Sequence, residues 1–165
     1  MCLHWLMAVL VFALIGIGWF MVDLPQGPDR SWYFALHKSI GLSVFALLAL
    51  RVAWRIGHRP PPLPTSVPLW QRGMAALAHL SFYAVLVVQP VSGYLSSSFS
   101  GYPTRVFGIP LPQWGWQDAP LNELFTEIHV ISSIALVVLI LVHVLGTVSH
   151  LVSGEGALFR RMWPW

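Results

Sequence analysis

The sequence predicts an all-α membrane protein built as a bundle of four transmembrane helices. Hydrophobic residues make up 56% of its 165 residues and charged residues only 9%, whereas soluble domains carry roughly 25% charged residues. Four stretches are apolar over the ~20 residues that one membrane crossing requires. Proline-rich segments separate these stretches. Composition and segment length together therefore exclude an ordinary soluble domain.

The first apolar stretch covers about residues 3–24. A secretory signal peptide is the alternative reading, because the stretch is N-terminal. It lacks a basic leading region and an A-x-A cleavage site, and it exceeds the usual apolar length of about 7–15 residues. We therefore expect a retained transmembrane helix.

The other stretches cover about residues 33–56, 74–98 and 121–152. The fourth exceeds one bilayer thickness, so we expect it to tilt or to project into the headgroups. The segments between the stretches are "PQGPDR", "HRPPPLPTSVPLWQR" and "SGYPTRVFGIPLPQWGWQDAP", whose prolines predict loops. No boundary divides the chain, so we expect a single transmembrane domain over residues 1–165.

The distribution of charge predicts the orientation. Six of the nine cations flank the second loop or follow the fourth stretch: Arg51, Arg55, Arg59, Arg72, Arg160 and Arg161. The opposite side holds the other three cations, Arg30, Lys38 and Arg105, and five of the six acids. The positive-inside rule then places both termini and the proline-rich loop in the cytoplasm.

The fourth stretch contains "HVISSIALVVLILVH", an apolar run with His129 and His143 at its ends. Fourteen residues of helix rise ~21 Å and make close to four turns, so both imidazoles lie on one face. One imidazole is thus expected near each membrane surface. His37 in the second stretch falls at the outer level with His129, and His4 in the first falls at the inner level with His143.

Each level therefore offers one imidazole from each of two helices, which suits a flat haem held from both sides. Neutral imidazole is a good ligand for iron, so these four histidines are the candidate metal ligands. A lone membrane histidine is more often an interface residue or a proton relay, but two level pairs make a stronger joint pattern. A zinc or proton-channel site is the main rival, and no cysteine or buried carboxylate joins either pair.

Small residues and the remaining histidines have weaker interpretations. Gly16, Gly18 and Gly41 are suited either to the close approach of a macrocycle or to ordinary helix packing. His79 competes for the inner level, and we expect it to be a neighbour of a haem propionate or a quinone. His58 is expected to be an interface residue, and His150, two turns beyond His143, is a candidate for proton handling.

The chain resembles the bacterial cytochrome b561 family of small four-helix di-haem proteins. Four stretches carry the resemblance and span essentially the whole chain: "HWLMAVLVFALIGIGWFM", "ALHKSIGLSVFALLALRVAWR", "ALAHLSFYAVLVVQPVSGYL" and "ELFTEIHVISSIALVVLILVHVLGTVSH". The resemblance implies two b-type haems, bound without covalent attachment. It assigns His4 with His143 to the inner haem and His37 with His129 to the outer haem, the same pairs that the levels give.

The resemblance also implies an inner-membrane protein that oxidises superoxide at the outer face and reduces ubiquinone at the inner face. The quinone region of such proteins involves the position of His150 and the proline-rich loop. Some members have a lysine in that loop, and this sequence has none between Arg59 and Arg72. Lys38 and Arg105 are candidates for attracting anionic superoxide. The alternative role of Lys38 is a membrane anchor or a propionate partner.

The sequence is compatible with three classes of function. The chain is predicted to be an oxidoreductase that acts on superoxide or another small electron donor. The alternative is a cytochrome b subunit that anchors a hydrogenase or a formate dehydrogenase and transfers its electrons. The long outer loop of residues 99–120, with Trp114 and Trp116, suits a lid or a docking surface for a redox partner. A haem-free structural or sensor protein is the third class, and no nucleic-acid partner is expected.

Overall fold

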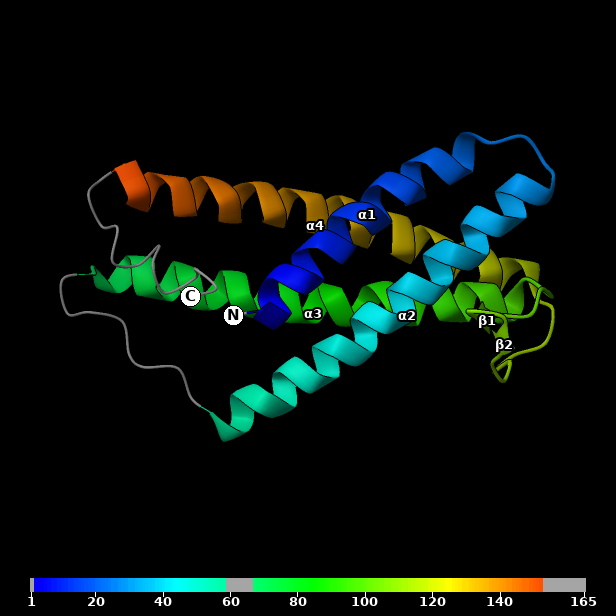
Figure 1. The fold of residues 1–165 in the computed structure, drawn as a ribbon, viewed down its shortest axis with the longest axis horizontal. Coiled ribbons are helices and arrows are strands. Elements are labelled where there is room, and N and C mark those ends of the chain that lie inside the picture. The colour runs from blue at the N-terminus through cyan, green and yellow to red at the C-terminus, as the bar shows by residue number, and fades with distance from the viewer. Residues whose placement is uncertain (1, 59–66, 153–165) are drawn as a thin grey trace.

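The computed structural model shows four long helices joined by loops (Figure 1). It describes residues 2–58 and 67–152, and for residues 150 and 151 it describes only the backbone. The helices are α1 (Cys2–Asp23), α2 (Pro28–Gly57), α3 (Leu69–Phe99) and α4 (Ala119–Val152), and two short strands are β1 (Arg105–Val106) and β2 (Ile109–Pro110). All four helices are long and apolar enough to cross a membrane. The predicted four-helix membrane bundle is therefore confirmed.

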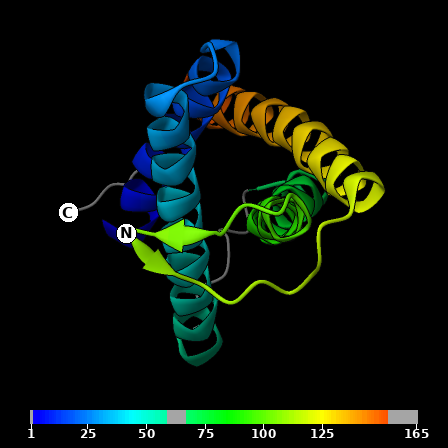
Figure 2. The same ribbon diagram turned by 90° about the vertical axis from the view of Figure 1, so that its right-hand side faces the viewer.

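The bundle consists of two helical hairpins that cross obliquely. α3 packs along α4 and α1 packs along α2, while α2 also meets α3 and β1 (Figures 1 and 2). Within the described residues, α4 makes no comparable backbone approach to α1 or α2. We call the end with the α1–α2 loop and the β-hairpin the outer end, and the opposite end the inner end. The two hairpins meet mainly through side chains.

An apolar layer joins the hairpins midway between the two ends. Its buried members come from three helices: Met7, Val11, Val44, Leu48 and Leu136. Partly buried side chains of α3, including Phe82, complete the layer. Leu136 lies on α4 midway between His129 and His143. An apolar layer therefore separates the two levels of histidines.

The helices begin earlier than the sequence pattern predicted. α2 begins at Pro28 rather than near residue 33, and α3 begins at Leu69 rather than near residue 74. Proline is favoured in the first helical turn, where its missing N–H costs no hydrogen bond, so Pro28 starts a helix instead of ending a loop. α4 begins at Ala119, because the carboxylate of Asp118 accepts a hydrogen bond from the Leu121 N–H at 3.0 Å and caps the helix.

A β-hairpin in the outer loop was not predicted. β1 pairs with β2 in antiparallel fashion, and the turn places Phe107 at φ 47° and Gly108 at φ 87°. Two residues with positive φ are typical of the tight type I′ hairpin turn. The Phe107 N–H donates to Oγ of Ser39 on α2 at 2.9 Å. The hairpin is thus fastened to α2 two residues after His37.

Candidate functional site

The four candidate ligands lie in two pairs, one toward each end of the bundle. At the outer level, the ring centroids of His37 on α2 and His129 on α4 are 6.1 Å apart, with their planes at 76°. At the inner level, the centroids of His4 on α1 and His143 on α4 are 6.4 Å apart, with their planes at 67°. The structure therefore brings together the same pairs that were predicted from depth.

These separations match the space that one iron atom requires between two axial imidazoles. A ring nitrogen binds a metal at about 2.0–2.1 Å and lies about 1.1 Å from its own ring centre, so two opposed rings have centroids about 6.3 Å apart. Both pairs join helices whose backbones do not pack against each other. The residues present thus fit a flat group held between the two helical hairpins. Within the described part of the chain, no three His, Cys, Asp or Glu side chains are arranged to hold one metal ion.

His129 is held in place by α3. Its Nδ1–H donates to the backbone oxygen of Gln89 at 2.9 Å, and the Gln89 side chain donates in return to the backbone oxygen of His129 at 2.9 Å. A Cβ atom on Gly93 would lie only 3.1 Å from the imidazole. A bond from Nδ1 to a carbonyl leaves Nε2 free, which is the usual arrangement of a metal-binding histidine.

His37 rests against α1 at the same level. A Cβ atom on Gly18 would lie 3.4 Å from its ring. The Leu14 backbone lies close to this ring, yet Nδ1 of His37 is buried without a well-formed hydrogen bond among the described residues. A Cβ added to Gly16 or Gly41 would meet nothing within 4 Å. Of the three glycines predicted from the sequence, only Gly18 touches a candidate ligand.

The inner level holds a third histidine and an arginine. The ring of His79 on α3 lies 6.1 Å from that of His143, about as close as His4 does. Its Nδ1–H donates to the backbone oxygen of Ala75 at 2.6 Å, and the side chain is exposed. Nη1 of Arg51 on α2 donates to Nδ1 of His4 at 3.0 Å. Ring separation alone therefore does not distinguish His4 from His79.

Helix packing does distinguish them. His79 and His143 lie on α3 and α4, which pack closely along each other, whereas His4 lies on α1, whose backbone stays apart from α4. A flat macrocycle between two rings needs room between the helices that carry them. The backbones of α1 and α4 lie farther apart than those of α3 and α4, so helix spacing favours His4 with His143.

Two of the three outer cations, Lys38 and Arg105, differ in exposure and in the partners that hold them. Nζ of Lys38 donates to Oγ of Ser97 on α3 at 2.7 Å, and the buried Thr104 hydroxyl donates to the same oxygen at 2.7 Å. The β-hairpin brings Arg105 beside α2, where its backbone oxygen accepts a long hydrogen bond from Ser39, the residue after Lys38. Arg105 is exposed and Lys38 is half-buried. The fold thus places the Arg105 backbone beside the turn of α2 that carries His37 and Lys38.

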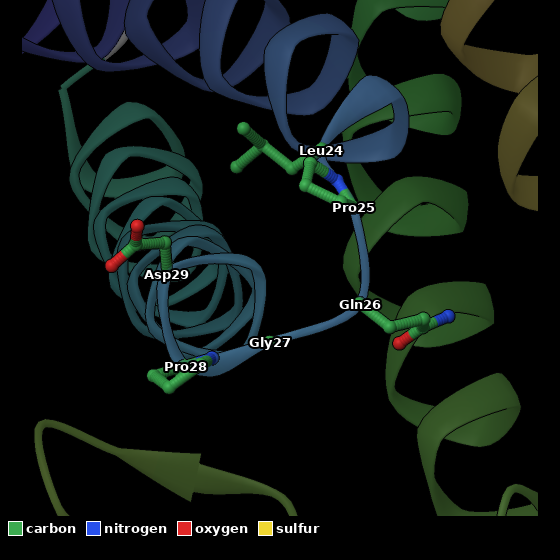
Figure 3. Close-up of a pocket in the computed structure, with 6 residues that line it drawn as sticks. All are labelled: Leu24, Pro25, Gln26, Gly27, Pro28 and Asp29. Carbon is green, nitrogen blue, oxygen red and sulfur yellow. The ribbon is translucent and has the colours of Figure 1, made fainter.

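Arg30, the third outer cation, lies in the first turn of α2, next to the α1–α2 connection. Its Nη1 donates to the backbone oxygen of Leu24 at 2.8 Å. Residues 24–29 line a small hollow in this connection (Figure 3), and none of the candidate ligands contributes to it. Arg30 is therefore held by its own loop rather than beside the histidine pair.

The remaining predicted residues lie at the periphery or outside the described side chains. His58 stacks on Trp54 with centroids 3.9 Å apart and is exposed, as expected for an interface residue. Trp114 and Trp116 in the outer loop are 76% and 71% exposed. The predicted proton-handling residue, His150, lies outside the side chains that the structure describes, as does the proline-rich loop at residues 59–66.

Comparison with known proteins identifies the family. The sequence matches the family described as prokaryotic cytochrome b561 over residues 1–165. The chain belongs to that family. It is also 39% identical over 121 residues to cytochrome b561 homolog 2 of Escherichia coli strain K12, and the match covers 71% of this chain. The chain spans 59% of the length of that relative.

Membership in the cytochrome b561 family indicates the class of function to test. The family consists of membrane b-type cytochromes of electron transfer, and it binds b-type haem. The histidine pairs in separate helical hairpins are the part of the bundle that fits such a group. The resemblance read from the sequence is thereby confirmed at the level of the family.

Sequence reasoning missed the residues that support the candidate ligands. Gly93, Gln89 and Arg51 all contact one of the four histidines. Gly93 and Gln89 sit four residues apart around Pro90 in a helix that otherwise reads as a plain apolar span. A polar side chain and a glycine on one face of a helix indicate that another element contacts that face. Which residue makes the contact, His129, becomes known only from the packing of α3 on α4.

Proposed function

We propose that this cytochrome is a single transmembrane domain that carries two b haems and moves electrons from the outer to the inner end of the bundle. His37 and His129 hold the outer haem, and His4 and His143 hold the inner one. When bound, haem b supplies one-electron redox chemistry; the chain supplies axial ligands, spacing and charge. The observation that carries the proposal is that both pairs have the separation of axial ligands across helices that do not pack together.

The outer end faces the periplasm of a bacterial inner membrane, and both chain termini lie in the cytoplasm. The positive-inside distribution of arginine and lysine supports this orientation. Superoxide is the proposed electron donor, because it is an anion, Lys38 follows His37 in α2, and the Arg105 backbone lies against Ser39 in the same turn. Clustered cations raise the encounter rate of an anion by roughly 10-fold or more.

Ubiquinone is the proposed electron acceptor at the inner end. Two superoxide ions lose one electron each and become dioxygen, and one quinone takes up both electrons with two protons to become a quinol. The exchange is therefore balanced without a further reactant. His150 is the proposed proton donor to the quinone, since the unperturbed pKa of histidine, about 6.5, suits proton transfer near neutral pH.

A second candidate function is an electron-transfer and anchor subunit for a soluble dehydrogenase of the hydrogenase or formate dehydrogenase type. The outer loop favours it, because Tyr102, Trp114 and Trp116 are each more than 70% exposed. Exposed aromatic side chains are enriched at protein interfaces and also at membrane surfaces. The two functions differ in what reaches the outer haem: a diffusing anion or a docked protein.

Stopped-flow reduction of the oxidised, haem-loaded protein by a superoxide pulse tests the proposal. We expect fast reduction that superoxide dismutase abolishes and that added salt slows, because exposed charges are screened within about 10 Å at 0.1 M salt. Lys38→Gln and Arg105→Gln should each slow the reaction several-fold, with haem content unchanged.

Arg30→Gln is the matched control. It also removes an outer cation, but the Arg30 guanidinium is tied to the Leu24 backbone oxygen and lies over the Phe34 ring at 5.5 Å. This variant should lose much less of the rate than Arg105→Gln. Reduction that is slow, or that dismutase does not affect, would favour the dehydrogenase-subunit function instead.

A further inference from the structure

The β-hairpin of the outer loop lies alongside the helices rather than beyond their ends (Figure 1). Its turn is fastened to α2, because the Phe107 N–H donates to Oγ of Ser39 at 2.9 Å, and the backbone oxygen of Arg105 lies 3.4 Å from the same hydroxyl. Ser39 comes two residues after His37, which is a rise of about 3 Å along the helix. The turn therefore lies near the depth of the outer histidine pair.

The segment that follows the hairpin reaches a similar depth beside α3. The Tyr94 hydroxyl donates to the backbone oxygen of Pro112, and the ring of Trp114 lies 6.5 Å from the Tyr94 ring. Tyr94 comes directly after Gly93, the residue that packs on His129. Two separate points of the outer loop are thus held near the level of the outer histidines.

The outer edge of the membrane hydrocarbon falls close to this level. Glu127 lies two residues outward of His129 on α4, and its side chain is exposed. Residues 128–148 then contain no Asp, Glu, Lys or Arg, and one crossing requires ~20 such residues. Because an exposed carboxylate is costly in hydrocarbon, the hydrocarbon of this leaflet ends between Glu127 and His129.

The side chains that the outer loop exposes at this depth are apolar or aromatic. Phe107 is 66% exposed, Ile109 is 68% exposed and Trp114 is 76% exposed. Residues 99–117 contain a single charged side chain, that of Arg105. Aromatic residues are enriched where membrane and water meet, since their rings suit the headgroup level. Exposed rings at this depth therefore meet lipid.

The backbone sets a limit to how deeply the hairpin enters the membrane. It consists of two short paired strands, β1 and β2, so each strand has an outer edge of N–H and C=O groups that the partner strand does not satisfy. Open strand edges do not occur in contact with hydrocarbon, because nothing there can form hydrogen bonds with them. The headgroup region supplies such partners. The hairpin is therefore suited to the interface and not to the membrane core.

We propose that the outer loop is a membrane anchor, in which Phe107, Ile109 and Trp114 lie among the phospholipid headgroups of the outer leaflet. The inference goes beyond the proposed function and depends on neither the electron donor nor the acceptor. Through the bond to Ser39, the anchor ties the membrane surface to the turn of α2 that carries His37. It also assigns to lipid an aromatic surface that a docked dehydrogenase would otherwise cover.

Fluorescent labels on single cysteines of the full, haem-loaded chain in phosphatidylcholine nanodiscs test this inference. Cys2→Ser removes the exposed natural cysteine, and Phe107→Cys, Ile109→Cys and Trp114→Cys each add one labelling site. Lipids brominated near the headgroup end of their acyl chains should quench all three labels several-fold. Comparison with discs of unbrominated lipid cancels the quenching by haem, and an unchanged haem spectrum shows that each variant is folded.

Gln26→Cys is the matched control. Gln26 is exposed in the α1–α2 connection at the same end of the bundle, between the carboxylates of Asp23 and Asp29. Brominated lipid should affect its label little, whereas iodide in the water should quench it more strongly than the labels of the outer loop.

Two outcomes would overturn the anchor. One is a Phe107 label that responds to brominated lipid and iodide as the Gln26 label does, and the other is a response to lipid at Trp114 alone. If Phe107→Cys fails to bind haem, Ile109→Cys decides the question for the same turn. Either outcome would make the hairpin a water-facing surface open to a docked protein and leave the two-haem function standing.

Discussion

The outer and inner levels of the bundle hold their histidines in different ways. At the outer level, His129 is held by a reciprocal pair of hydrogen bonds with Gln89 and fits against Gly93, so its ring has little freedom. At the inner level, His4 and His79 lie at similar distances from His143, and Arg51 contacts His4. The outer site is fixed by contacts around each ring. At the inner site, the spacing of the helices is what distinguishes His4 from His79.

Removal of the ligands should produce the largest effect. His37→Ala or His129→Ala should reduce the haem content from about two per chain to about one and abolish the outer signal. His4→Ala or His143→Ala should do the same to the inner signal. Without one of its two histidines, a level would hold a haem through a single imidazole and would bind it less tightly. Haem quantitation with reduced-minus-oxidised spectra measures the loss.

The pairing itself is tested by comparing the four variants. Both members of a pair should affect the same haem and leave the other one spectrally intact. Retention of both haems with unaltered spectra after all four changes would exclude these residues as ligands. A change of the outer signal in His4→Ala would show that the levels are wrongly paired.

A substitution at Gly93 should produce the next largest effect. A methyl group there would lie 3.1 Å from Cε1 and Nδ1 of His129, well inside the ordinary carbon contact of about 3.5–4.0 Å. The ring must shift, and its bond to Gln89 is strained. Gly93→Ala should lower outer haem occupancy several-fold or alter the electron paramagnetic resonance signal of that haem, and leave the inner signal unchanged.

Gly16→Ala is the matched control, since a Cβ atom there meets nothing within 4 Å. It should leave both haems as in the wild type. Gly18→Ala should have a small effect on the outer haem, because its Cβ would reach only ordinary contact with His37 at 3.4 Å. A Gly93→Ala protein with the outer signal and occupancy of the wild type would show that the close packing of His129 is not needed.

The two levels of histidines could be derived from the sequence, because periodicity and depth are properties of single helices. Fourteen residues between His129 and His143 determine both their rise and their common face, and apolar length identifies the spans. Helix starts were predicted less well, because Pro28 reads equally as part of a loop or as a first turn. The outer β-hairpin was missed, since its turn depends on Phe107 adopting a positive φ that this residue type rarely takes.

The supporting residues were not predictable, because each depends on which helices pack together. Gly93 and Gln89 gain meaning only once α3 lies along α4, and Arg51 only once α1 lies along α2. The sequence suggested Gly41 as a site of close approach, yet a Cβ atom there would touch nothing within 4 Å. The position of a residue along one helix can be predicted from the sequence. The residues that it contacts on other helices can be identified only when the packing of the helices is known.

His79→Ala should have the smallest effect, and it is the sharpest test of how the inner level is selected. The His79 ring lies 6.1 Å from His143, and its Nδ1–H donates to Ala75, which leaves Nε2 free as in a ligand. By local geometry His79 is thus a credible ligand. It is nevertheless exposed, and it lies on α3, which packs directly on α4 and leaves little room for a macrocycle.

If the spacing between helices determines which histidine is the inner ligand, His79→Ala should keep both haems and a bis-histidine spectrum. The potential of the inner haem should shift only slightly, because a neighbouring imidazole is lost. His4→Ala, measured in parallel, should lose the inner haem. The reverse result, with loss in His79→Ala and retention in His4→Ala, would mean that the free Nε2 of His79 outweighs helix separation, and that α3 and α4 must part to admit the haem. Haem quantitation and low-temperature electron paramagnetic resonance on the two variants distinguish these outcomes.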